Sequence, residues 1–431
     1  MRMAMLLALA AALVLQGSTP GPAMNQAAGS VGPKPIVWTE LTGAGQEARA
    51  IALDGRCPGA SIDGAMTPMR LRAPAGEGFP VASCQVLIPP GARSVEIASQ
   101  RLPLMTRPPQ RIVIFGDTGC RIRGEQVQDC NNTAAWPFPL VARLAAAHHP
   151  DLIIHVGDYY YRESACPPGR QGCVGSPFGD AWDSWRADFF DPAQPLFQAA
   201  PFVFARGNHE VCYRGGQGWT RFLDAGGQGL GCADTEAPFK VDIGGLNLYV
   251  VDSAESEDRS APPPDVARIA RQLDALAPDL AARPGWIVTH RPVWAVTPFA
   301  RLGPVGPAEI SLDKTLQAAV RGRDLSAVAM IVSGHVHHFA AYDFGGARPS
   351  QLVAGTGGDA AEDSDLARPR AGDKRIDGMT AHRLTFQRFG FLMLERDGAA
   401  WNGTFRDLND LVVATCRLEG RDLRCQAPGR P

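Results

Sequence analysis

Five short motifs place an aspartate, an asparagine or a histidine directly after an apolar run of the sequence. They are Gly116-Asp117, Gly157-Asp158 with Tyr161 three residues on, Gly207-Asn208-His209-Glu210, His290, and Gly334-His335-Val336-His337. Carboxylates and imidazoles together bind metals such as Zn, Mn and Fe. One carboxylate can bridge two such ions about 3.5–4 Å apart, and the pair then contacts both the attacking and the leaving oxygen of a phosphoryl group. The motifs therefore indicate a two-metal centre suited to hydrolysis at phosphorus.

Taken singly each motif is weak, because a Gly-Asp dipeptide is most often a turn and a buried histidine is most often a core residue. Together they are informative, because each one follows a predicted strand. The predicted strands are residues 111–115, 152–156, 202–205, 246–251, 285–289, 329–333 and 351–354, and the predicted helices are residues 140–147, 264–276 and 312–321. Strands that alternate with helices predict an α/β fold, in which loops at the carboxyl ends of the strands line the ligand site. We therefore expect the five motifs to meet at one edge of the core.

The first part of the chain differs from this pattern. Arg2 precedes an apolar run of about 13 residues, too short to span a bilayer of about 30 Å and typical of an export signal. The alternative is an uncleaved anchor or a buried helix. We assign residues 1–25 to a signal peptide and expect no membrane span after its removal. Residues 30–108 alternate between short apolar runs and Gly or Pro turns, which predicts a small all-β module ahead of a catalytic domain over residues 109–431.

The charge balance excludes one class of partner. Lys and Arg number 42 against 44 Asp and Glu, so the net charge is −2. The chain therefore has no electrostatic basis for binding nucleic acid or an anionic membrane as its main partner. A small-molecule substrate is expected instead, and the oligomeric state is unknown at this stage.

The ten cysteines form five couples of sequence neighbours, and no C-x-x-C pair occurs. An even count without that pair argues against a zinc knuckle or a thioredoxin-like site and favours disulfides. The predicted pairs are Cys57–Cys84, Cys120–Cys130, Cys166–Cys173, Cys212–Cys232 and Cys416–Cys425. With the signal peptide, they predict a periplasmic or secreted protein.

The ordered motifs GD, GDxxY, GNHE, H and GHxH resemble those of the calcineurin-like metallophosphoesterases, and the GDxxY form resembles the purple acid phosphatases. The resemblance covers residues 111–358. It departs from many relatives at Gly119, where they carry a histidine two residues after the first aspartate. It implies a layered β-sandwich core flanked by helices.

The resemblance also implies a role for each motif residue. The first ion, Fe(III), would be held by Asp117, Asp158, Tyr161 and His337, and the second, a divalent Fe, Zn or Mn ion, by Asn208, His290 and His335, with Asp158 as the bridge. His209, together with Asn208, would contact the substrate phosphate. His209 would also act as general acid while a metal-bound hydroxide attacks phosphorus. The implied activity is that of an exported, acid phosphatase-like hydrolase of small phosphomonoesters.

Two other functions are open at this stage. The first is a divalent-metal phosphodiesterase or nucleotidase. The plant members of the family carry further histidines after the fourth motif, the one with His290, and residues 293–299 of this chain contain none. The second is an inactive phosphate-binding protein, against which His209 argues, since a binding protein needs no general acid. Arg291 is expected either to contact substrate phosphate or to form a surface ion pair, and Glu210 to have a supporting role.

Overall fold

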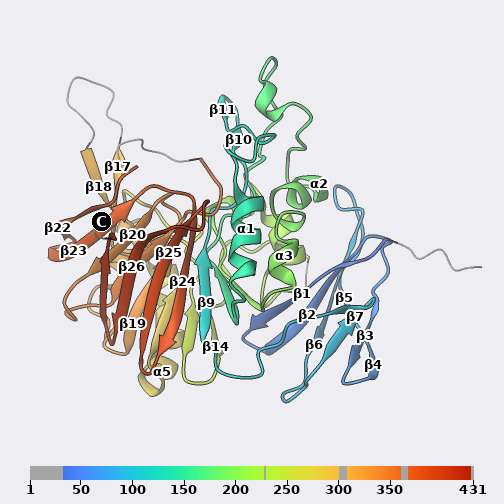
Figure 1. The fold of residues 1–431 in the computed structure, drawn as a ribbon, viewed down its shortest axis with the longest axis horizontal. Helices are drawn as coiled ribbons and strands as arrows, with labels where there is room; N and C mark the ends of the chain where they lie inside the picture. The colour runs from blue at the N-terminus through green and yellow to red at the C-terminus, as the bar shows by residue number, and fades with distance from the viewer. Residues whose placement is uncertain (1–32, 228–229, 300–307, 361–366, 429–431) are drawn as a thin grey trace, which may run out of the picture. The chain divides into compact units, whose positions relative to one another are not determined.

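The computed structural model of the protein describes residues 33–227, 230–299, 308–360 and 367–428. The predicted signal peptide, residues 1–25, lies outside the described residues. Two large β-sheets form the centre of the described chain, and helices cover their outer faces (Figure 1). This arrangement confirms the predicted α/β class with a layered β core.

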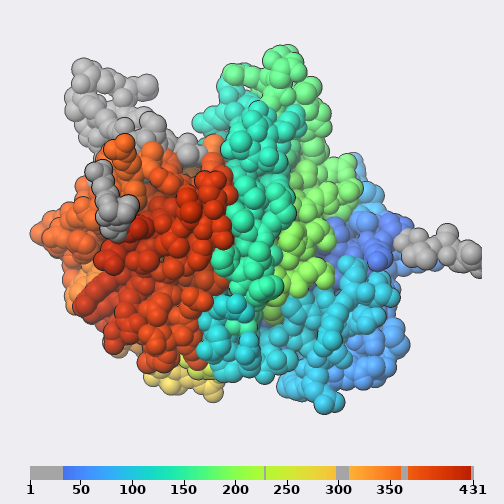
Figure 2. Space-filling model, viewed as in Figure 1, coloured from blue at the N-terminus to red at the C-terminus, as the bar shows by residue number. Residues whose placement is uncertain are grey.

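The first sheet has eleven strands and carries three of the five motifs. In spatial order they are β27 (Asp422–Gln426), β26 (Val412–Glu419), β25 (Ala400–Asp407), β24 (Gly390–Asp397), β9 (Arg111–Phe115), β12 (Leu152–His155), β13 (Phe202–Phe204), β1 (Ile36–Thr42), β2 (Gly45–Ala52), β6 (Ala82–Leu87) and β5 (Arg70–Ala73). Because β9, β12 and β13 are parallel, the loops that follow them leave the sheet at the same end. The blue N-terminal and red C-terminal strands flank this central group on opposite sides (Figure 1, Figure 2).

The second sheet has eight strands and carries the other two motifs. In spatial order they are β14 (Phe239–Asp242), β15 (Asn247–Val250), β16 (Gly285–Val288), β19 (Val328–Ser333), β21 (Ser350–Ala354), β20 (Phe339–Asp343), β23 (Met379–Phe386) and β22 (Arg370–Ile376). The strands from β15 to β21 in this order are parallel, so the motif loops after β16 and β19 also share one end.

Successive side chains along the central strands point to opposite faces of the sheet and pack into an apolar cluster on each face. On β9, Ile112 and Ile114 join the apolar cluster between the two sheets, while Val113 and Phe115 join the cluster under the helices. A strand with two buried faces needs apolar residues at every position. This explains why the strand that leads to Asp117 is apolar from Ile112 to Phe115.

Helices cover the outer face of each sheet. The helices over the first sheet are α1 (Phe138–Ala147), α2 (Trp182–Trp185), the π-helical turn η2 (Arg186–Phe190), α3 (Gln194–Phe197) and α4 (Gly216–Phe222). Figure 1 shows α1 beside α3. The helices over the second sheet are α5 (Pro263–Ala282) and α6 (Lys314–Val320). Two short 3₁₀ helices, η1 (Gln171–Cys173) and η3 (Asn208–Glu210), lie in loops. The three predicted helices are confirmed, with shifted ends. Within the described ranges, none of the helices combines the length and the apolar character that crossing a membrane requires.

The region before residue 108 is all β, as predicted. It supplies β1, β2, β5 and β6 to the first sheet and forms a separate sheet of β4 (Ala65–Pro68), β3 (Gly59–Ile62), β7 (Val95–Ile97) and β8 (Gln100–Arg101). β1 runs parallel to β13, with Glu40 opposite Phe202, and so joins this region to the motif-bearing strands. Two further two-stranded sheets pair β10 (Ile122–Arg123) with β11 (Gln126–Val127) and β17 (Ala295–Phe299) with β18 (Ala308–Leu312).

No element is predicted beyond residue 354, but six strands, β22 to β27, follow there and extend both sheets. For β22 the reason is that six of its seven residues are exposed or half-buried and several are charged. A strand with so few buried side chains lacks the apolar run by which the other strands are recognised.

The five predicted disulfides are all present, and the described chain holds no free cysteine. Cys120–Cys130 closes a loop that begins shortly after Asp117, and Cys212–Cys232 closes one that begins shortly after His209. These two bonds therefore restrain the loops that carry the motifs.

Candidate metal centre

Hydrogen bonds join the carboxyl ends of the two sheets. The N–H of Gly116 donates to the carbonyl of Ala354 at 2.9 Å, across the gap between the sheets. Nδ1 of His290, after β16, lies 2.8 Å from the carbonyl oxygen of Val156, after β12. The motif loops of the first sheet therefore lie against those of the second, as the strand-end positions predict.

Four of the predicted ligands form a first group around the phenol oxygen of Tyr161. This oxygen lies 2.9 Å from Oδ2 of Asp158, 3.3 Å from Oδ1 of Asp117 and 3.2 Å from Nε2 of His337. All four side chains are buried. Donor atoms from three different loops thus converge on one small volume.

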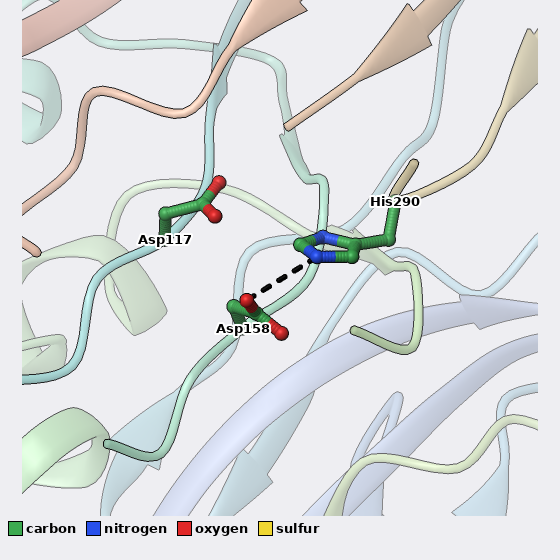
Figure 3. Close-up of side chains that lie close together, drawn as sticks. All are labelled: Asp117, Asp158 and His290. Carbon is green, nitrogen blue, oxygen red and sulfur yellow. Dashed lines mark ion pairs between the residues drawn. The ribbon is translucent and has the colours of Figure 1, made fainter. Parts of the chain in front are cut away.

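A second group forms around His290. Its Nε2 lies 3.2 Å from Oδ2 of Asp158 and 3.0 Å from Oδ1 of Asn208. The ligand atoms of Asp117, Asp158 and His290 all lie within 4.8 Å of one another, and Figure 3 shows Asp158 directed at His290 with Asp117 beside them. Asp158 therefore belongs to both groups, which is the position that a bridging carboxylate needs.

His335 lies at the side of the second group. Its ring centroid is 5.3 Å from that of His290, and its main-chain N–H donates to both carboxylate oxygens of Asp117 at 3.1 Å. Its Nε2 faces Asp258 at 3.0 Å. Nδ1 is therefore the ring nitrogen of His335 that is left for an ion.

The donor set suits two metal ions. Two aspartates, three histidines, an asparagine and a tyrosine supply the oxygen and nitrogen donors that Fe, Zn and Mn accept. Two buried carboxylates at this separation also need positive charge nearby to offset their repulsion. The residues present therefore fit a two-metal centre.

The charges of Asp158 and His290 depend on each other. Burial disfavours the ionised form of Asp158, but His290 and His209 outweigh it and hold the pKa of this carboxyl well below its usual value. Burial likewise opposes the charged form of His290, but Asp158 raises the pKa of the imidazole to about 8. The two groups thus form a charged pair at the centre of the site.

Three predicted ligands adopt a backbone conformation that L-residues rarely take. The φ angles are 58° at Asp117, 61° at Asp158 and 70° at His335, all in the left-handed region. A glycine precedes each of these three residues, but only Gly157 has a positive φ, at 101°. The ligand residues themselves therefore carry most of the strain, as is common at functional sites.

Glu210 holds the loop that carries Asp158. Its two carboxylate oxygens accept the N–H groups of Gly207 and Asp158 at 3.0 Å, of Tyr159 at 2.9 Å and of Tyr160 at 3.2 Å. Burial, together with the nearby Asp158, raises the pKa of Glu210 to about 8. Its role in the structure is therefore a supporting one.

His209 lies on the ring of Tyr161, with the two ring centroids 3.7 Å apart. Its Nδ1 lies 2.9 Å from Oε1 of Glu163, which pairs with Arg214 at 2.6 Å, and its Nε2 faces Asp158 at 3.8 Å. Burial lowers the pKa of His209 to about 4, against the opposing effects of Asp158 and Glu163. When Nδ1–H donates to Glu163, Nε2 is left to face Nη2 of Arg214 at 2.8 Å and Asp158 at 3.8 Å.

Three carboxylates that the motifs do not identify hold histidines of the site. Glu163 contacts His209, Asp258 contacts His335, and Asp359 lies 3.2 Å from Nδ1 of His337. Carboxylates at the outer nitrogen of a ligand histidine fix its orientation and its tautomer. Glu163 lies two residues after Tyr161, and Asp359 directly follows Gly357 and Gly358, so a search of the sequence close to the motifs and turns could have identified both. Asp258 has no such signal.

Arg291 forms an ion pair with Asp258 at 2.9 Å, but the pair is not on the open surface. Its side chain is 13% exposed, and that of Asp258 is 31% exposed. Nη1 of Arg291 also lies 3.1 Å from Nε2 of His335, and within the described part of the chain its buried Nε has no hydrogen-bond partner. A fixed positive charge therefore lies next to the second ligand group.

Comparisons with known proteins agree with this geometry. The chain matches the family profile described as calcineurin-like phosphoesterase over residues 110–339, more than half of its length, and it belongs to that family.

The purple acid phosphatase PPD1 isolated from yellow lupin (Lupinus luteus) seeds has a similar structure, with a TM-score of 0.53 and 15% identity over 91% of this chain and 74% of the lupin chain. PhoD is similar over 93% of both chains, with a TM-score of 0.54 and 13% identity. Both likenesses concern the fold. No curated protein matches the chain in sequence. Membership of the family implies a hydrolase with a dinuclear metal site.

Proposed function

We propose that the protein is an exported phosphatase that hydrolyses small phosphomonoesters at a centre of two metal ions. Fe(III) would occupy the first position and a divalent Fe, Zn or Mn ion the second. The residues that would hold the first ion are Asp117, Asp158, Tyr161 and His337, and those for the second are Asp158, Asn208, His290 and His335.

The observation that carries the proposal is the buried phenol oxygen of Tyr161, 2.9 Å from Asp158 and 3.2 Å from His337. A phenol, whose usual pKa is about 10, is a poor ligand for a divalent ion at neutral pH. A trivalent ion stabilises the phenolate much more strongly, because a bound cation dominates the local pKa. This donor therefore favours Fe(III) over Zn or Mn in the first position.

The chain's own residues would bind the substrate and move the proton. When bound, the two ions would supply a nucleophilic water near neutral pH and neutralise the charge of the phosphoryl group. Asn208 and His209 would contact the phosphate from η3. In its doubly protonated form, which the negative charge of a bound phosphate would favour, His209 would donate the Nε2 proton to the leaving oxygen as the phosphorus–oxygen bond breaks and keep the Nδ1 proton on Glu163, 2.9 Å away.

The five disulfides support the proposed export, because such bonds persist in the periplasm or outside the cell and are rare in the cytosol. Export would also supply the oxidising conditions that these bonds need.

Elemental analysis together with the turnover of two chromogenic substrates tests the proposal. We expect iron plus one divalent ion in each chain, and faster hydrolysis of nitrophenyl phosphate than of bis-nitrophenyl phosphate. Two divalent ions with a preference for the diester would instead indicate a phosphodiesterase. Bound phosphate without turnover of either substrate would indicate a phosphate-binding protein.

A further inference from the structure

A cavity of about 550 Å³ lies at the amino end of the second sheet. It is formed by the end of α6 and by the turns that precede β19, join β20 to β21, join β22 to β23 and join β26 to β27. The charged residues that line it are four arginines, Arg321, Arg323, Arg348 and Arg421, and two aspartates, Asp324 and Asp377. We call it the arginine cavity.

The arginine cavity is separate from the candidate metal centre. β19 and β21 begin at the cavity, whereas the motif with His335 and His337 follows the other end of β19. A six-residue strand such as β19 is about 20 Å long, at roughly 3.3 Å per residue. A ligand in the cavity would therefore make no contact with the metal ligands.

Two of the arginines have hydrogen-bonding capacity that the protein does not use. Nη1 of Arg348 and Nε of Arg421 are buried and have no hydrogen-bond partner among the residues that the structure describes. The nearest acidic group to Arg348 is Asp377, whose Oδ2 lies 3.5 Å from Nη1, beyond a good charge-assisted hydrogen bond. Buried donors of this kind are costly unless they have a partner.

The aspartates do not balance the arginines. Asp377 is shared, because Arg321 approaches it at 3.7 Å as well as Arg348. Arg323 is satisfied by Asp274, outside the lining, at 2.9 Å. Even so, the guanidinium groups that face the cavity outnumber its carboxylates, so the cavity favours an anion.

Aromatic rings hold one of these guanidinium groups in place. Arg348 lies over the ring of Trp294, with its Cζ 4.6 Å from the centroid, and 5.0 Å from the centroid of Phe344. Its Nη2 also donates to the carbonyl of Asp377 at 3.3 Å. A stacked guanidinium loses little freedom when it binds an oxyanion, which makes it suited to phosphate.

We propose that the arginine cavity binds a phosphate group, either free inorganic phosphate or the phosphate of a small ester. Its volume is within the range of small-molecule sites, about 300–1,000 Å³. Arg348 and Arg421 donate to the phosphate oxygens, and the turn residues around them fix its position. This site does not depend on the proposed phosphatase activity.

Equilibrium dialysis with radiolabelled inorganic phosphate tests the site in the full chain. The measurement is made on Asp158→Asn, in which phosphate binding at the metal centre is impaired, and on the same variant with Arg421→Gln, Arg348→Gln or Arg424→Gln. Arg424 is the matched control, because it lies on β27 near Arg421 but outside the cavity, with a 78% exposed side chain. We expect one phosphate for each chain, with binding at least tenfold weaker after either cavity substitution and unchanged after Arg424→Gln.

Competition by glycerol phosphate separates the two sources. Displacement of the labelled phosphate supports an ester ligand, and failure to displace it supports free phosphate. No phosphate binding in Asp158→Asn overturns the proposal, as does binding that both cavity substitutions leave unchanged. A lower melting temperature for Arg421→Gln with unchanged phosphate affinity would also overturn it, because Arg421 would then stabilise the turns around the cavity without binding phosphate. Phosphatase activity of the wild type is measured separately, so failure of one proposal leaves the other intact.

Discussion

The ring of Tyr161 fills the space that a side chain at Gly119 would need. A Cβ atom on Gly119 would lie 2.7 Å from Cδ2 of Tyr161 and 2.8 Å from the carbonyl oxygen of Tyr159. Cβ atoms do not approach other atoms so closely. A histidine two residues after Asp117 therefore has no room in this structure, because the main chain of Tyr159 and Tyr161 excludes its Cβ as well as the tyrosine ring does. The chain has the tyrosine, and its first ligand group contains a phenol in place of that imidazole.

Substitution of Tyr161 tests the first metal position. A phenolate bound to Fe(III) absorbs visible light by charge transfer, so the iron-loaded protein is expected to be coloured and Tyr161→Phe to be bleached. The controls are Tyr159→Phe and Tyr160→Phe, because their hydroxyls donate to the carbonyls of Ala205 and Arg162. The measurement is the visible absorption spectrum of each protein, together with the amount of iron that it binds. A colourless wild type that is fully active with zinc or manganese alone would contradict the Fe(III) assignment.

Removal of the His209 imidazole tests the proton donor. We expect His209→Ala to keep both metal ions and to lose about 10²–10⁴ in kcat for an alkyl phosphate, the usual contribution of a positioned general acid. The loss should be much smaller for nitrophenyl phosphate, whose leaving group needs no proton. The comparison of the two substrates is the measurement. Equal losses would indicate that His209 only binds the phosphate.

Asp258 is expected to orient His335 for the second metal ion. Its carboxylate lies 3.0 Å from Nε2 of His335, and the amide of Asp258→Asn cannot replace that charge. We expect the affinity for the second ion to fall about 10- to 100-fold. Elemental analysis after dialysis against buffered concentrations of the divalent metal provides the measurement. Glu257→Gln, which alters the neighbouring exposed carboxyl, is the control. Equal retention of the second ion by Asp258→Asn and wild type would exclude this role.

Glu40 is expected to make stability depend on pH. Burial raises the pKa of this carboxyl from 4.5 to about 7, although Arg49 lies 3.7 Å away and opposes the shift. The folded protein therefore holds the proton more tightly than the unfolded chain. The free energy of unfolding should accordingly fall as the pH rises from about 4.5 to about 7.

The variant Glu40→Gln should remove this fall, which is on the order of 3 kcal/mol for one group with such a shift. Urea unfolding across that pH range provides the measurement. At about pH 4, where Glu40 is protonated in both states, the two proteins should be similarly stable. Parallel stability curves for the variant and the wild type would contradict the assignment.

Local patterns predict the motif-bearing strands because each one is apolar on both faces and ends at a chemically distinctive residue. The end of α5 shows where such patterns fail. A helix is expected to stop before Pro278, since proline removes a main-chain hydrogen bond. α5 nevertheless continues to Ala282, and Leu280 in this last turn is buried against the second sheet. Tertiary packing there outweighs the local preference.

In the candidate site, too, local sequence patterns predict some features and tertiary packing decides others. Asp158 and Tyr161 can be found from sequence because three residues separate them on one loop. Asp258 contacts His335 across 77 residues of sequence, and no local pattern records that contact. The left-handed conformation of Asp117 is equally hidden, because it depends on the loops that pack around it. Sequence patterns thus identify the ligand candidates but not the groups that orient them.

The pairing of β1 with β13 has a consequence for any shortened form of the protein. A fragment that begins at residue 109 would make β13 an edge strand, with unpaired N–H and C=O groups along one side. It would also lose Trp38, whose ring lies 5.6 Å from those of Phe190 and Phe197, and so uncover apolar surface beside that edge. The motif-bearing region alone would then be open to strand addition by a second copy of itself. The N-terminal strands therefore cover an edge at which the motif-bearing region could otherwise pair with a second copy of itself.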